Sequence, residues 1–176
     1  MIAWLRRAKF GVGIWRLCAL TICVLFSLPG HAEDIPILAI GGEVERPLSL
    51  SAKQLGAMHH VTAKVREHNG LVSEYEGVPL VDLLESAGFT FGKALRGKRL
   101  ATYLLVQARD GYAEVFALPE LDPAFNDRMI FLAYSKNGDV LPLEEAPLRV
   151  IVSDEKREGR WIRQVVALKV ISVGSQ

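Results

Sequence analysis

The stretch VTAKVREHNGLVSEYEGVPLVDLL, residues 61–84, combines a strand pattern, a turn signal and a helix start. Apolar and polar residues alternate over residues 61–66, which is the period of a half-buried strand. Asn69-Gly70 follows as a strong hairpin signal, so we expect a second strand to return after it. A strict two-residue turn would pair Val65 with Glu74 and mismatch the apolar faces, which favours a bulge or a longer loop.

The same stretch ends in the helix that the sequence predicts most clearly. Pro79 suits the first helical position, because its ring fixes φ and an N–H there needs no partner. Gly88 is a suitable stop, and the apolar residues between them fall on one stripe: Leu80, Leu83, Leu84 and Ala87. A strand, turn, strand and helix in this order form a scaffold, and they contain no catalytic motif of their own.

Strand patterns outnumber helix patterns along the rest of the chain. We expect strands at residues 36–42, 100–108, 112–118, 129–134, 148–152 and 165–173, and a short helix at 52–58 that opens on a capping box from Ser51 to Gln54. Asp110-Gly111 predicts a second hairpin, with Val106 and Ala108 opposite Val115 and Ala113. Because hairpins and not regular crossover helices join the strands, the sequence predicts an α+β domain with mixed and antiparallel strands.

The first 32 residues are expected to be an export signal that precedes a single domain at residues 33–176. Four basic residues, Arg6, Arg7, Lys9 and Arg16, precede an uncharged apolar run at residues 17–28, and Gly30-His31-Ala32 fits a cleavage site. The run is short for a membrane span, so a permanent anchor and a lipoprotein attached at Cys23 are the minor alternatives. We therefore expect a periplasmic or secreted protein.

Removal of that segment changes both the charge and the cysteine content. The remaining chain has 17 basic and 20 acidic residues, or a net charge of about −3, which argues against nucleic acid as the main partner. Both cysteines, Cys18 and Cys23, lie inside the expected signal. The mature chain would then have no disulfide, no thiolate nucleophile and no cysteine ligand for a metal.

Basic residues gather in the loop SDEKREGRWIRQV, residues 153–165, between the last two expected strands. Guanidinium groups beside a flexible glycine suit a phosphate or a carboxylate, because they offer bidentate, charge-assisted hydrogen bonds. The alternative is a solvated loop whose own acidic residues offset its cations. We select Lys156, Arg160 and Arg163 as the candidate anion-binding residues.

No motif in the sequence identifies a catalytic centre. There is no G-x-S-x-G elbow, no P-loop, no G-x-G-x-x-G and no H-E-x-x-H. His59, His60 and His68 remain after cleavage, and their spacing with Glu67 matches no metal motif, so surface histidines are expected. We therefore assign no catalytic residue and no metal ligand.

The order of four segments resembles the molybdopterin-binding domain of the sulfite-oxidase family of oxidoreductases. The segments are YEGVPLVDLLESAG at 75–88, ARDGYAEVFALPEL at 108–121, LAYSKNGDVLPLEEAPLRVIV at 132–152 and GRWIRQVVALKV at 159–170. The Gly-x-Pro-Leu helix start and the NG-x-x-LP…PLR-x-(I/V)-V run are the strongest parts. The resemblance implies a sulfite-oxidase-like fold that holds a pyranopterin dithiolene cofactor for oxo-transfer or reductase chemistry at molybdenum.

The resemblance also implies the positions of site residues. Catalytic members place a metal-ligating cysteine roughly a dozen residues before the Gly-x-Pro-Leu motif. That window here is residues 65–68, and it contains Glu67 and His68 but no cysteine, which indicates a degenerate active site. Arg160 and Arg163 keep the family's basic pattern near the pterin phosphate. With Lys156 they are our candidate cofactor-binding residues.

These observations favour a non-catalytic exported module whose former cofactor groove binds a small anionic ligand or a partner protein, without a cofactor. The alternative is a molybdopterin-dependent oxidoreductase whose metal is held by the cofactor alone or by Glu67 or His68. A third hypothesis is a structural or signalling partner of a membrane sensor, with no ligand. The Arg6-Arg7 pair leaves general secretion and twin-arginine export both open.

Overall fold

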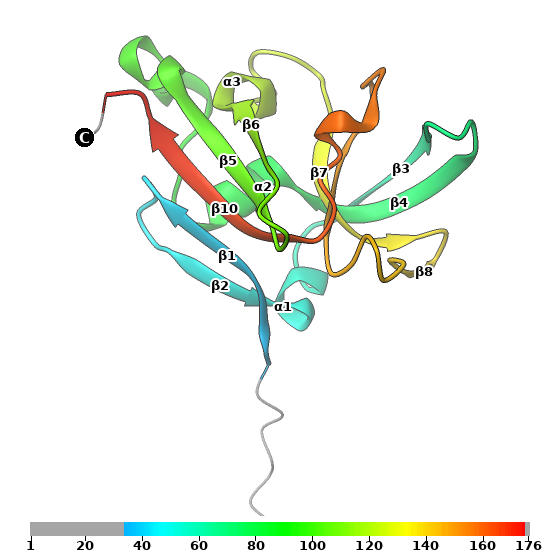
Figure 1. Cartoon of the computed structure of the whole chain (residues 1–176). Helices are drawn as coiled ribbons and strands as arrows, with labels where there is room; N and C mark the ends of the chain where they lie inside the picture. Colours follow the sequence, from blue (N-terminus) through cyan, green and yellow to red (C-terminus); the bar gives the residue numbers. More distant parts are fainter. Residues whose placement is uncertain (1–33, 175–176) are drawn as a thin grey trace, which may run out of the picture. The chain divides into compact units, whose positions relative to one another are not determined.

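Two β-sheets form most of this computed structural model, which describes residues 34–174 (Figure 1). Sheet A contains, in spatial order, β2 (Leu48–Ser51), β1 (Pro36–Gly42), β10 (Val165–Ser172), β5 (Thr102–Ala108) and β6 (Ala113–Ala117). β1 and β10 run parallel, and the other neighbouring pairs in this sheet are antiparallel. The central strand of sheet A is therefore the last strand in sequence.

Sheet B is antiparallel and divides at one end. Its order is β3 (Val61–Arg66), β4 (Val72–Pro79), β7 (Ile130–Lys136) and β8 (Asp139–Val140), and β9 (Arg149–Val152) also pairs with β7. The first residues of β7 pair with β9, and its last two pair with β8. As a result, the loop between β8 and β9 begins and ends beside β7.

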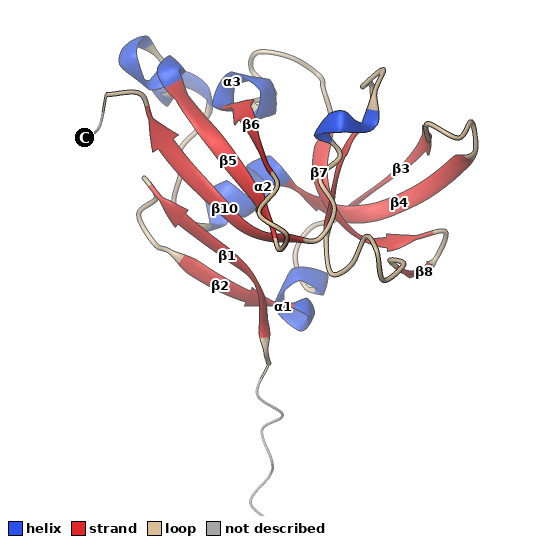
Figure 2. Ribbon diagram, viewed as in Figure 1, coloured by secondary structure: helices blue, strands red, loops and turns tan. Residues whose placement is uncertain are grey.

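Short helices connect the strands (Figure 2). They are α1 (Ala52–Gly56), α2 (Leu80–Ser86) and α3 (Leu118–Leu121), with 3₁₀ turns η1 (Gly92–Ala94), η2 (Gly97–Ala101) and η3 (Glu158–Arg160). Helix α2 buries Leu80, Leu83 and Leu84 in a hydrophobic core that both sheets share. Within residues 34–174, no helix is long and apolar enough to cross a membrane.

The mixed sheets and few short helices confirm the predicted α+β class. The capping box of α1 is present, because Gln54 N–H donates to Ser51 Oγ at 3.3 Å and Ser51 N–H donates to Gln54 Oε1 at 2.9 Å. Helix α2 begins one residue later than predicted, with Pro79 as its N-cap, and Gly88 follows it with φ of +87°. The expected export signal, with both cysteines, lies outside the described residues.

The two hairpins differ in how well the sequence predicted their register. In the first, Val65 pairs with Ser73, so residues 67–71 form the longer loop that the mismatched faces had indicated. In the second, Leu105 lies opposite Val115, so the predicted pairing of Val106 with Val115 is wrong by one residue. The loop there is longer by one residue than a two-residue turn, and Gly111 adopts φ of +89° within it.

The glycine of the Gly-x-Pro-Leu motif is explained by close backbone packing. Gly77 lies in β4 where a bulge alters the pairing with β7. A Cβ at this position would be 2.2 Å from the carbonyl oxygen of Leu132. Only glycine therefore lets β4 approach β7 at this point, just before the chain turns into α2.

Candidate functional site

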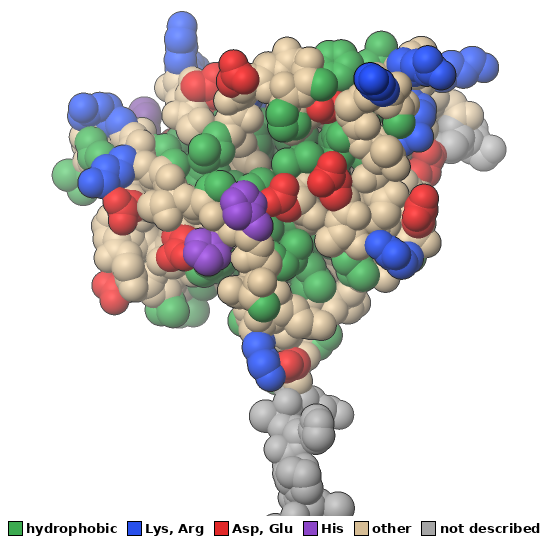
Figure 3. All heavy atoms as spheres, turned by 180° about the vertical axis from the view of Figure 1, so that it is seen from behind, with side chains coloured by type: hydrophobic (Ala, Val, Ile, Leu, Met, Phe, Trp, Pro, Cys, Tyr) green, Lys and Arg blue, Asp and Glu red, His purple; other side chains and the backbone are tan. Residues whose placement is uncertain are grey.

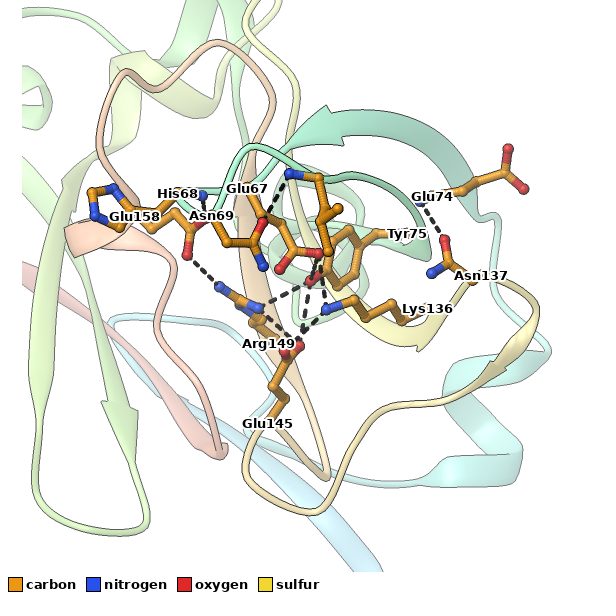
Figure 4. Close-up of polar contacts among 11 residues, drawn as sticks. Glu67, His68, Asn69, Glu74, Tyr75, Lys136, Asn137, Glu145, Arg149 and Glu158 are labelled. Atoms are coloured by element: carbon orange, nitrogen blue, oxygen red, sulfur yellow. Dashed lines mark hydrogen bonds and ion pairs between the residues drawn. The ribbon is translucent and has the colours of Figure 1, made fainter.

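Charged and polar side chains converge beside β4, β7 and β9, under the loops at residues 67–71 and 153–164 (Figure 4). An open hollow of about 530 Å³ lies here. Its lining consists of Glu67, Asn69, Lys136, Glu144, Glu145, Arg149, Glu158, Trp161 and Arg163. These residues come from distant parts of the chain, and the meeting of sheet B with the two loops brings them together.

Arg149 is the most buried cation of the hollow, with 4% of its surface exposed. Its Nη1 lies 2.9 Å from Glu145 Oε2 and donates to the Tyr75 hydroxyl at 3.0 Å. Its Nη2 donates to Glu158 Oε2 at 3.1 Å. Burial lowers the pKa of Arg149, but Glu145, Tyr75 and Glu158 more than offset this and raise it, so the guanidinium is charged.

The hydroxyl of Tyr75 contacts three charged side chains of the hollow: Glu67, Glu145 and Arg149. Its fully buried side chain places the hydroxyl 3.3 Å from Glu67 Oε1 and 3.4 Å from Glu145 Oε2. The hydroxyl has one proton, so it donates to one carboxylate at a time while it accepts from Arg149. Burial is the main reason that the pKa of Tyr75 is raised, which keeps the phenol neutral.

Glu67 and Lys136 form a close ion pair in the wall of the hollow. Lys136 Nζ lies 2.8 Å from Glu67 Oε1 and 3.3 Å from Glu145 Oε1. Burial alone would raise the pKa of Glu67, but hydrogen bonds from Lys136 and Ser73 lower it below its ordinary value. Burial likewise opposes the charge of Lys136, yet its partners raise the pKa of the ammonium group. Both groups are therefore charged, and each holds the other in place.

Two buried donors at the hollow lack a partner within residues 34–174. They are Arg149 Nε and Trp161 Nε1, on side chains that each line the hollow. A buried donor without an acceptor is costly, and native proteins contain few of them. The indole ring of Trp161 also meets the ring of Tyr75 edge-on, with centroids 6.5 Å apart.

The three candidate residues of the basic loop occupy different environments. Arg163 is exposed and lines the hollow. Arg160 points elsewhere: it lies 2.9 Å from Glu120 and 3.5 Å from Glu155, and its guanidinium stacks 4.4 Å from the centroid of Phe116. Lys156 is exposed and is not part of the lining. The structure thus brings only Arg163 to the hollow, and a cofactor-binding role for all three stays a prediction.

Sequence reasoning did not select the residues at the centre of the site. Arg149, Tyr75 and Lys136 all lie inside the segments that carry the family resemblance, but none of them has a signal of its own. An arginine inside the apolar run LRVIV was the available indication, because a buried arginine must be paired. The identity of its partners could not be read from that run.

The three histidines of residues 34–174 lie on the surface. The space-filling view from behind shows histidine side chains beside acidic ones (Figure 3). His59 Nδ1 lies 2.7 Å from Asp82, His60 Nε2 lies 3.4 Å from Glu76, and His68 is exposed on the 67–71 loop. In the part of the chain that the structure describes, no group of three or more His, Cys, Asp or Glu residues could hold a metal ion.

Comparison with known families identifies the fold. Residues 32–175 match the family model described as the oxidoreductase molybdopterin binding domain. The chain belongs to this family. Among solved structures, the sulfane dehydrogenase SoxCD from Paracoccus pantotrophus is similar, with a TM-score of 0.60 and 21% sequence identity. The match covers 78% of this chain and 39% of that one, so this member of the family spans well under half of its neighbour's length. No curated protein matches the sequence.

The family's cofactor requires donors for its anionic groups and, in the catalytic members that the sequence resembles, a thiolate for its metal. Arg163 supplies such a donor, but the lining also carries four carboxylates, namely Glu67, Glu144, Glu145 and Glu158. The second is not met, because residues 34–174 contain no cysteine and Glu67 is already bound by Lys136. The residues of this hollow therefore do not fit a molybdenum centre that a protein thiolate ligates.

Proposed function

We propose that this chain is an exported member of the molybdopterin-binding domain family that binds a small anionic ligand or a partner protein at the hollow and does not catalyse oxo transfer. The Glu67–Lys136 ion pair is the main observation behind the proposal. Glu67 lies in residues 65–68, the segment where the resemblance places the metal-ligating cysteine. A carboxylate is a hard ligand, and it differs from a thiolate in the metals that it prefers.

Energetics support the same conclusion. A metal at Glu67 Oε1 would displace Lys136, and the side chain of Glu67 is just 10% exposed. Removal of one partner from a largely enclosed ion pair is destabilising, because the other charge loses its counter-ion while it stays partly out of water. Lys136 would keep only its longer contact with Glu145, and Tyr75 would lose one of its two acceptors. The pair therefore opposes metal ligation through Glu67 Oε1.

The hollow has the dimensions and chemistry of a binding site. Its volume of about 530 Å³ lies within the range of small-molecule sites. The exposed Arg163 and the guanidinium of Arg149 supply donors for an anion, which would take the place of one of the four carboxylates of the lining. An anionic group from a small molecule or from a partner protein would find these cations at the same place.

Metal analysis of the protein purified from its native compartment tests the proposal. We expect substoichiometric molybdenum and no pterin, together with no visible absorption band. Stoichiometric molybdenum with pterin would overturn the proposal and would support an oxidoreductase with unusual metal ligation. Reconstitution with the cofactor gives a second test, since electron transfer to a redox dye afterwards would also contradict it.

The proposed export rests on residues 1–32, and N-terminal sequencing of the protein recovered from outside the cytoplasm measures it directly. A mature chain that begins at Glu33 is expected. A chain that keeps Met1 would contradict cleavage, and it would favour the anchored alternative.

A further inference from the structure

Two donors at the hollow are placed to hold both oxygens of one carboxylate. The backbone N–H of His68 donates to Glu158 Oε1, and Arg149 Nη2 donates to Glu158 Oε2 at 3.1 Å (Figure 4). One donor belongs to the 67–71 loop and the other to β9, so the carboxylate of Glu158 bridges two elements. Each oxygen has its own donor, which is the arrangement that a planar carboxylate requires.

Glu158 is a more replaceable partner of Arg149 than Glu145 is. The side chain of Glu145 is 9% exposed and contacts Arg149 and Lys136 together. The side chain of Glu158 is 26% exposed. Glu158 is the first residue of η3, in the loop between β9 and β10. If Glu158 turned to solvent, Arg149 would keep Glu145 and Tyr75, whereas loss of Glu145 would take one partner from Arg149 and one from Lys136.

We propose that Glu158 stands in for a ligand, and that a small organic monocarboxylate binds between His68 N–H and Arg149 by displacing it. This proposal rests on the proposed ligand-binding function and names the class of ligand. The incoming carboxylate accepts the two hydrogen bonds that Glu158 gives up, and the side chain of Glu158 turns to solvent. The indole of Trp161 in the lining provides an apolar wall for the rest of the acid.

The charge of the lining matches a monoanion. When Glu158 turns outward, three carboxylates (Glu67, Glu144 and Glu145) and three cations (Lys136, Arg149 and Arg163) remain around the hollow. With Glu158 in place the lining has four carboxylates and three cations, so a monoanion that displaces Glu158 leaves the net charge of the lining unchanged. A dianion or trianion would meet the carboxylates with an excess charge, so it is disfavoured.

The test compares Glu158→Ala with Glu155→Ala. Glu155 lies in the same loop with a similar side-chain exposure of 22%, but it pairs with Arg160 outside the hollow. Acetate is titrated into each purified full-length chain, acetamide is the neutral control, and the NMR shift of the His68 backbone amide reports binding. A tethered carboxylate competes at an effective concentration in the millimolar range, so its removal should tighten acetate binding by about tenfold or more.

Acetate should therefore bind Glu158→Ala more tightly than it binds the wild-type chain, and Glu155→Ala should match the wild type. Equal affinity of all three chains would overturn the proposal, as would an equal response to sulfate or phosphate. Glu158→Gln retains the side-chain volume, and it should shift affinity in the same direction if the alanine variant does not fold. The titration uses protein without molybdenum. Detection of molybdenum in the native protein would overturn the proposed function and leave this result intact.

Discussion

Tyr75 connects three charged side chains through a single hydroxyl group. Tyr75→Phe should lower the free energy of unfolding by about 1–3 kcal/mol, because Arg149 Nη1 then loses an acceptor in a buried place. Urea denaturation measures the change. Tyr134→Phe is the matched control, since its hydroxyl donates at 3.1 Å to Glu76, whose side chain is 37% exposed, and it should cost less than about 1 kcal/mol. Equal losses in both variants would contradict a special role for Tyr75.

At the same scale, the sequence reveals some site residues and hides others. Arg163 could be selected because it lies in a visibly basic loop, and it does line the hollow. Arg160 lies three residues earlier in that loop, yet it pairs with Glu120. Local composition cannot distinguish the two, because Glu120 comes from α3 and the direction of each side chain depends on tertiary packing.

The backbone conformation of the turn between β7 and β8 is determined by two residues, Asn137 and Gly138. Asn137 and Gly138 have φ values of +55° and +84°, as a two-residue hairpin turn requires. Gly138→Ala should cost about 1–2 kcal/mol, because a side chain disfavours this backbone conformation although a Cβ would meet no atom within 4 Å.

Gly41→Ala is the control for this turn. A Cβ at Gly41 also meets nothing within 4 Å, and Gly41 does not have a positive φ. Thermal unfolding should therefore show a lower midpoint for Gly138→Ala only. A similar decrease in both variants would mean that the strain of the left-handed conformation is not the cause.

Most elements could be predicted from the sequence because their signals are local. The strand at 36–42 and the capping box of α1 agree with the structure residue by residue. The register of the second hairpin could not be predicted, because apolar residues occur on both faces of β5 and β6. Val115 is 46% exposed opposite the partly buried Leu105, so side-chain polarity did not identify the buried face.

The acid stability of the whole molecule should depend on Glu67. Its pKa is lowered from the ordinary value of 4.5, so its carboxylate stabilises the folded state above pH 4.5. This contribution is lost as the pH falls from 4.5 through the lower pKa of the folded state. The difference in free energy of unfolding between the wild type and Glu67→Gln should thus be constant near pH 7 and shrink below pH 4.5.

Denaturant unfolding at a series of pH values measures this dependence. Glu74→Gln is the control, because Glu74 pairs with Lys64 at 3.5 Å on the surface and such pairs contribute about 0–1 kcal/mol. A difference for Glu67→Gln that grows as the pH falls would contradict the assignment of a charged Glu67–Lys136 pair.

The position of β10 has a consequence for how the protein is made. β10 lies between β1 and β5 in sheet A, yet it is the last of the described strands to be synthesised. A growing chain can form the β5–β6 hairpin and the β3–β4 hairpin early, because these contacts are local. The pairing of β1 with β10 must bridge more than a hundred residues, from Ala39 to Ala167. Sheet A is therefore completed only after residue 172 has emerged, and until then β1 and β5 each expose an edge that a chaperone can cover.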